Sequence, residues 1–73
     1  MKIEFVGGNT GQGGSPRIYR DEESGDIIVQ GYLVTDPDDL AQMKVPAGET
    51  VVRVPPNLFN HLPEDVRHGL AGR

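Results

Sequence analysis

The sequence contains no cysteine, which excludes disulfides, thiolate metal ligands and cysteine nucleophiles. It contains no tryptophan, and aromatic residues make up only 5% of the chain. No apolar run approaches the roughly 20 residues that a membrane-spanning helix needs, and the first residues lack the apolar stretch of a signal peptide. Because small secreted domains usually need disulfides, we predict a cytoplasmic protein without a membrane partner.

Basic residues are also scarce. Seven Lys and Arg stand against eleven Asp and Glu, so the net charge is −4. The basic residues are scattered along the chain, whereas nucleic-acid binders gather them on one face to neutralise phosphates. We therefore expect no direct contact with nucleic acid, and an acidic chain of this kind is suited to docking on a basic surface.

The length allows one small domain, residues 1–73, with a modest core, because only 36% of the 73 residues are apolar. In so short a chain the burial of apolar surface barely offsets the entropy lost on folding. A large catalytic cleft in such a core is not expected. We predict a non-enzymatic protein without a cofactor.

Period-two alternation and β-branched residues predict the strands. We expect the segment Pro16–Arg20 at a sheet edge, because proline and charges surround it. Gly31 interrupts the strongest strand and indicates a bulge or the close approach of another backbone, and Gly25 suits the left-handed position of a turn over residues 21–26. The expected strands are Lys2–Val6, Pro16–Arg20, Ile27–Val34 and Thr50–Val54.

Helix signals follow the last two strands. Thr35 or Asp36 caps a helix that ends near Met43, with Leu40 and Met43 facing the sheet. A helical turn is expected over 57–62, and a short helix from Pro63 onward ends in a frayed tail at residues 71–73. The predicted fold class is α+β, with a small three- to four-stranded antiparallel sheet and short helices after strands 3 and 4.

The glycine-rich segment 7–15 is predicted to be a flexible loop, since five of its nine residues are glycine. It lacks the Gly-Lys-Ser/Thr ending of a phosphate-binding loop and is not followed by the helix of a dinucleotide fold. A small ligand-binding protein or enzyme that uses this loop stays open as an alternative function.

The sequence offers weak candidates for a metal site and none for catalysis. His61, Glu64 and His68 have helical ligand spacing, but Pro63 interrupts the helix and no fourth residue completes the set. The acidic groups at residues 21–26 and 36–39 lack the calcium-loop spacing. Turn formation explains the first group and helix capping the second, so we predict no bound metal.

The segment Val52–Leu58 followed by Leu62 resembles the strand–proline–helix start of swapped-hairpin antitoxins and transition-state regulators. That resemblance implies a dimeric DNA-binding regulator. Only Arg53 and Arg67 are nearby to supply the basic DNA face of those proteins, so this reading is the runner-up to the leading hypothesis.

A broader resemblance covers most of residues 2–59. It rests on the string Val29-Gln30-Gly31-Tyr32, on Thr35-Asp36-Pro37 and on Leu40-Ala41-Gln42. These features are similar to those of a group of small actinobacterial proteins of unknown function that are often encoded beside helix-turn-helix regulators. The resemblance implies a regulatory context without a mechanism.

The leading hypothesis is an acidic interaction protein, an accessory to a cytoplasmic transcriptional regulator such as a helix-turn-helix protein. The segment 27–34 has apolar residues on both faces. Such a strand needs a cover, which a homodimer, another partner or a sheet closed on itself provides. The predicted partner-binding residues are Arg17, Tyr19, Tyr32, Arg53, Asn57 and His61.

Overall fold

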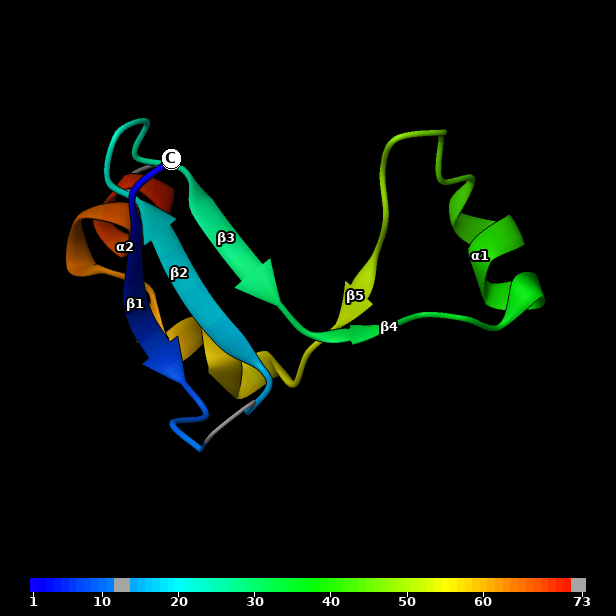
Figure 1. Ribbon diagram of the computed structural model, residues 1–73, viewed down its shortest axis with the longest axis horizontal. Coiled ribbons are helices and arrows are strands. Elements are labelled where there is room, and N and C mark those ends of the chain that lie inside the picture. Colours follow the sequence, from blue (N-terminus) through cyan, green and yellow to red (C-terminus); the bar gives the residue numbers. More distant parts are fainter. Residues whose placement is uncertain (12–13, 72–73) are drawn as a thin grey trace.

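The computed structural model describes residues 1–11 and 14–71 and shows a small α+β fold in two parts (Figure 1). The body comprises the described residues of 1–30 and 55–71, and the arm comprises residues 31–54. The predicted fold class is confirmed, with the strands divided between a three-stranded antiparallel sheet and a separate two-stranded ribbon. The elements are β1 (Ile3–Gly8), β2 (Arg17–Asp21), β3 (Ile27–Gln30), β4 (Tyr32–Leu33), α1 (Pro37–Met43), β5 (Val52–Arg53), the 3₁₀ turn η1 (Pro56–His61) and α2 (Glu64–Ala71).

Strand β2 lies at the centre of the body sheet, between β1 and β3. The prediction of an edge position was wrong. Pro16 precedes the strand and so removes no hydrogen-bond donor from its ladder. The charges of the strand have their own partners: the Arg20 guanidinium donates to both carboxylate oxygens of Asp65, at 3.2 and 3.0 Å.

Strand β1 continues through Gly7 and Gly8, so the expected loop 7–15 begins two residues later than its glycines predict. The register shifts between Phe5 and Gly7, so that Gly7 pairs with Ile18 and Gly8 with Arg17. Gly8 has a φ of 117°, and a Cβ there would lie 2.4 Å from the carbonyl oxygen of Pro16. Only glycine fits this approach. Residues 12–13 of the loop lie outside the described residues, and its flexibility stays a prediction.

The turn between β2 and β3 follows the expected chemistry. Gly25 takes the left-handed conformation with a φ of 84°. Its N–H donates to the carbonyl of Asp21 at 2.7 Å, and the N–H of Asp21 donates to the carbonyl of Asp26 at 2.9 Å. These bonds close the hairpin that places β3 beside β2.

Gly31 separates β3 from β4, so the expected continuous strand Ile27–Val34 is divided at this residue. A Cβ at Gly31 would lie 2.6 Å from Val54 Cγ1 and 2.8 Å from the carbonyl oxygen of Arg53. The glycine therefore marks the close approach of another backbone, one of the two readings that the sequence offered. Strand β4 pairs with β5 and not with the body sheet, so β3 is an edge strand of that sheet (Figure 1).

The arm carries α1 at its tip. Asp36 caps this helix, because its Oδ1 accepts from the N–H groups of Asp38 at 2.8 Å and Asp39 at 3.4 Å. The helix begins and ends as predicted, but the expectation that Leu40 and Met43 face the sheet was wrong. No residue of α1 is buried, and Met43 is 47% exposed.

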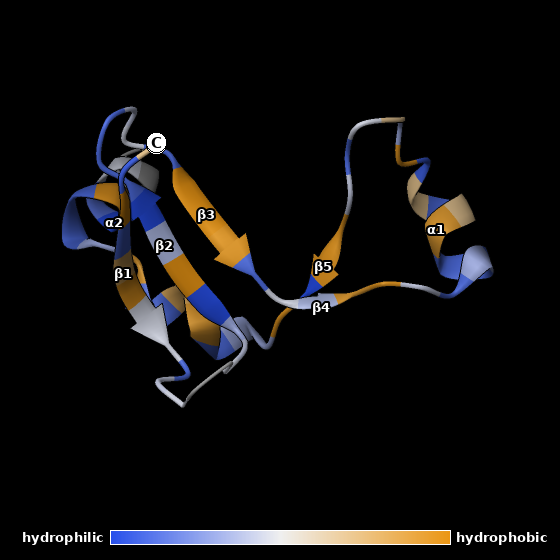
Figure 2. Ribbon diagram, viewed as in Figure 1, coloured by the Kyte–Doolittle hydropathy of each residue, from blue (hydrophilic) through white to orange (hydrophobic). Residues whose placement is uncertain are grey.

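The core lies between the inner face of the body sheet and η1. Ile18 on β2 is fully buried, and Leu58 on η1 is 2% exposed. Strand β3 is hydrophobic over most of its length and borders this core (Figure 2). Burial of one such side chain stabilises the fold by about 1.5–3 kcal/mol. The predicted helical turn and the helix after Pro63 are present as η1 and α2.

The C-terminal part of the predicted frayed tail, residues 72–73, lies outside the described residues, and Ala71 is the last residue of α2. Within the described part of the chain, no helix has the length and apolar character to cross a bilayer.

Candidate interaction surface

An aromatic pair stands on the outer face of the body sheet. Phe5 on β1 and Tyr19 on β2 are cross-strand partners, and their ring centroids lie 6.0 Å apart at an interplanar angle of 69°. Tyr19 follows the buried Ile18, so it points to the opposite face of the sheet from the core. Phe5 remains 45% exposed. The edge-to-face pair therefore offers an apolar surface to solvent.

Arg17 completes this cluster and joins it to the glycine-rich loop. Its guanidinium carbon lies 5.7 Å from the Phe5 ring centroid, within the range of a cation–π contact. Its Nη1 donates to the Tyr19 hydroxyl at 3.3 Å, and its Nε donates to the carbonyl of Asn9 at 2.7 Å. A third bond runs from Nη2 to the carbonyl of Gly11. The guanidinium thus fixes the first half of the loop against the aromatic pair.

Gln30 extends the network to the far side of the loop. The Tyr19 hydroxyl donates to Gln30 Oε1 at 3.2 Å, and Gln30 Nε2 donates to the carbonyl of Gly14 at 3.2 Å. We call Phe5, Arg17, Tyr19 and Gln30 the aromatic face. Its polar atoms are already paired with one another and with the loop, so its geometry exists before any partner arrives.

The aromatic face borders a shallow pocket of about 220 Å³, which is lined by Phe5, Thr10, Arg17 and Tyr19. Sites for small molecules usually occupy about 300–1,000 Å³. This pocket is smaller and open to solvent. It is suited to receiving one side chain of a larger partner.

A second pocket lies where the arm leaves the body. Its volume is about 280 Å³, and its lining residues are Tyr32, Arg53, Val54 and Pro55. Tyr32 and Arg53 are cross-strand partners in the ribbon. Tyr32 is 64% exposed, so the ring is available at the surface.

The six residues expected to bind a partner are therefore divided among three places. Arg17 and Tyr19 lie together in the aromatic face, and Tyr32 and Arg53 lie together at the base of the arm. Asn57 is exposed on η1.

His61 lies apart from the aromatic face, because η1 packs on the inner face of the sheet. A Cβ at Gly7 would fall 2.5 Å from His61 Cβ. The absence of a side chain at Gly7 thus lets η1 approach β1.

Sequence reasoning missed Phe5 and Gln30 as members of the surface. Period-two alternation predicts the strand Lys2–Val6 but does not show which of its faces is exposed. The signal that identifies Phe5 as exposed is its cross-strand pairing with Tyr19, whose neighbour Ile18 is the core residue.

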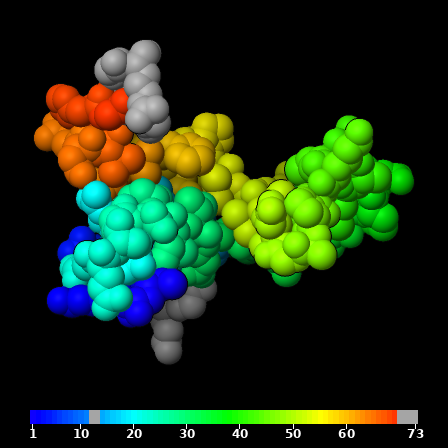
Figure 3. Space-filling model, turned by 90° about the horizontal axis from the view of Figure 1, so that it is seen from above, coloured from blue at the N-terminus to red at the C-terminus, as the bar shows by residue number. Residues whose placement is uncertain are grey.

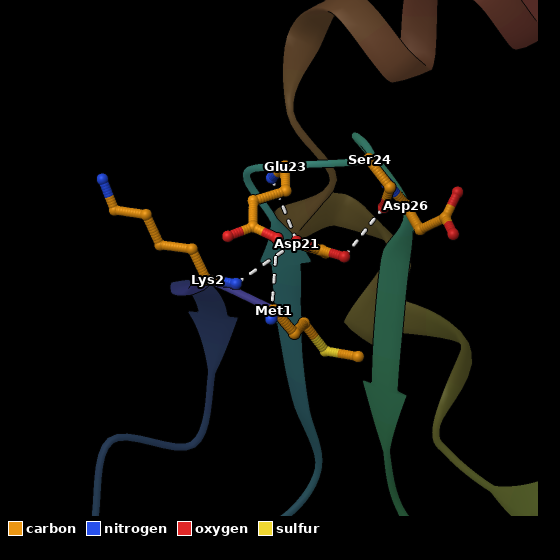
Figure 4. Close-up of polar contacts among 6 residues, drawn as sticks. All are labelled: Met1, Lys2, Asp21, Glu23, Ser24 and Asp26. Carbon is orange, nitrogen blue, oxygen red and sulfur yellow. Dashed lines mark hydrogen bonds and ion pairs between the residues drawn. The ribbon is translucent and has the colours of Figure 1, made fainter.

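In the acidic turn 21–26, the carboxylate of Asp21 is engaged in hydrogen bonds with neighbouring residues (Figure 4). The Asp21 carboxylate accepts from the N–H of Glu23 at 3.0 Å, the Ser24 hydroxyl at 2.9 Å and the N–H of Lys2 at 3.4 Å. These bonds, led by the one from Glu23, lower the pKa of Asp21. Asp21 therefore fastens the start of β1 to the turn and is not a free ligand.

The candidate metal ligands do not come together in residues 1–11 and 14–71. His61 ends η1 while Glu64 and His68 belong to α2, and in this range no three His, Asp or Glu side chains gather as a metal site requires. Asp36 caps α1, and Asp38 and Asp39 lie in the first turn of that helix.

Comparison of the chain with protein-family models, with curated proteins and with solved structures finds no match.

Proposed function

We propose that the chain is a non-enzymatic interaction protein, an acidic accessory to a transcriptional regulator, and that the regulator contacts the aromatic face. The observation that carries this proposal is the preorganised cluster of Phe5, Arg17 and Tyr19 around a pocket of side-chain size. Aromatic residues and arginine dominate the binding energy of protein interfaces, where they surround or fill such pockets.

Charge supports a protein partner over nucleic acid. The net charge is −4. Among the described residues, Arg17 donates to loop carbonyls, Arg20 is paired with Asp65, and Lys2 Nζ lies 3.2 Å from Glu22. With three cations engaged in this way and a net negative charge, the chain has little to offer a phosphate backbone. A helix-turn-helix regulator has the basic surface that an acidic accessory complements, and the resemblance to proteins encoded beside such regulators points to the same partner.

The test is affinity capture of the full-length chain, expressed in the cells that encode it, with Phe5→Ser and Ile3→Ser as a matched pair. Both residues lie on β1, and their exposures are 45% and 48%. We expect a helix-turn-helix regulator to bind the unmodified chain and Ile3→Ser, and to bind Phe5→Ser at least about tenfold more weakly when both proteins are purified.

Equal binding of the two variants would remove the aromatic face from the proposal. Salt-dependent DNA binding by the chain alone would replace the accessory role with that of a DNA-binding regulator.

A further inference from the structure

We infer that the arm binds the arm of a second copy of this chain, so that the protein is a homodimer joined through β4. This surface is distinct from the aromatic face, and the inference does not depend on the proposed regulator. The arm extends from the body as a separate lobe joined by a narrow neck (Figure 3).

The arm contains too little internal packing to hold its shape. Strands β4 and β5 are joined by two residue pairs, Tyr32 with Arg53 and Leu33 with Val52. An isolated two-stranded ribbon is marginally stable in water, and a helix as short as α1 is unstable without packing. No residue of α1 is buried, and α1 makes no extensive contact with another element of the described chain.

The arm nevertheless presents large apolar side chains to solvent. Tyr32 and Leu33 are each 64% exposed, and Met43 is 47% exposed. These residues carry no formal charge at neutral pH, so their burial against a copy removes no ion from water.

The surface of the chain exceeds that of a compact monomer by the amount that a dimer interface needs. The accessible area is 5626 Å², whereas a compact monomer of this mass exposes about 4,400 Å². The surplus of about 1,200 Å² exceeds the roughly 800 Å² that each partner buries in a standard interface. The radius of gyration agrees: it is 13.9 Å, against about 11 Å for a compact chain of this length.

A second copy supplies the missing cover by symmetry. Strand β4 pairs with β5 along one edge, and its other edge has no partner strand in residues 1–11 and 14–71. Antiparallel pairing of β4 with β4 of a second copy joins the two ribbons into a four-stranded sheet about a two-fold axis. Four strands with shared apolar faces satisfy the stability condition that the single ribbon fails.

The first experiment measures the mass of the full-length chain in solution by sedimentation equilibrium at micromolar concentration. We expect twice the 7.9 kDa of one chain, with dissociation on dilution. Leu33→Asp places a charge in the paired edge and should weaken the dimer at least about tenfold. Ile3→Asp, an equally apolar exposed site on the body, should leave the dimer unchanged. A single-chain mass at every concentration overturns the inference.

The second experiment uses the absence of cysteine, which gives a clean background for cross-linking. Leu33→Cys should form a disulfide-linked dimer under mild oxidation much faster than Arg67→Cys, which lies on the exposed surface of α2. Equal rates for the two variants overturn the pairing through β4. Circular dichroism of each cysteine variant verifies that the body is folded. A misfolded variant is then not mistaken for one that has lost the interface.

Discussion

Replacement of Gly31 by alanine should detach the two strands of the arm while leaving the body folded. The new Cβ would meet Val54 Cγ1 at 2.6 Å and the carbonyl oxygen of Arg53 at 2.8 Å. The valine methyl can rotate away, but the carbonyl belongs to the backbone of β5, so the strand itself must move. Overpacking of this kind costs about 1–3 kcal/mol.

That cost is as large as the free energy that the cross-strand pairs of the ribbon contribute, or larger. The ribbon has two cross-strand pairs, and each contributes roughly 0.2–1 kcal/mol. We therefore expect the nuclear Overhauser contacts between Tyr32 and Arg53, and between Leu33 and Val52, to disappear in Gly31→Ala. The amide shifts of β1 and β2 should stay in place, and the dimer should weaken with the ribbon.

Gly69→Ala is the matched control. A Cβ at Gly69 would meet no atom within 4 Å, and alanine in a helix is favoured over glycine by roughly 0.5–1 kcal/mol. This variant should be as stable as the unmodified chain or more so. Gly31→Ala would contradict this prediction by keeping the contacts between the strands, or by unfolding the body together with the arm.

Leu58→Ala should lower the free energy of unfolding by about 2–5 kcal/mol, a large share of the total for so small a domain, and urea denaturation measures it. The lowered pKa of Asp21 means that its carboxylate contributes stability above its unfolded pKa of about 3.9, and that this stability is lost as the pH falls through the folded-state pKa; Asp21→Asn should flatten the acid limb of the stability–pH curve. Asp36→Ala removes the cap of α1 and should cost the helix about 1 kcal/mol, seen as reduced helical chemical shifts over residues 37–43. Arg17→Met keeps the stem of the side chain but removes its donors, so backbone order parameters of Asn9 and Gly11 should fall while those of β2 persist; unchanged values would mean that the arginine does not hold the loop.

Local sequence patterns predicted the type of each element correctly, but they did not predict which elements pack or pair with one another. Alternation at Ile3 and Phe5, the β-branched run from Ile27 and the capping signals around Asp36 each describe one segment, and each segment has the expected type. The central position of β2 depends on which strands pair with it. No pattern within the strand itself encodes that choice, and its flanking proline and charges favoured the wrong answer.

The orientation of α1 shows the same limit. The spacing of Leu40 and Met43 defines a helix face, but the sequence does not say whether anything meets that face. In the structure, no element of the described body packs against this face of α1, and no residue of the helix is buried.

The candidate surface was predictable only in part. Arg17 and Tyr19 were selected from the sequence, whereas Phe5 required knowledge of the strand register.

Gly31 and Val54 lie against each other at the base of the arm. The arm leaves and re-enters the body at one point, so the body is assembled from two sequence pieces and the arm is an insertion between them. Replacing the arm by a tight turn would shorten the loop that the body must close and lower the closure cost by about 1.5 kcal/mol. Shortening or replacing the arm should therefore leave the body folded, and changes confined to this segment should alter assembly before they alter the sheet.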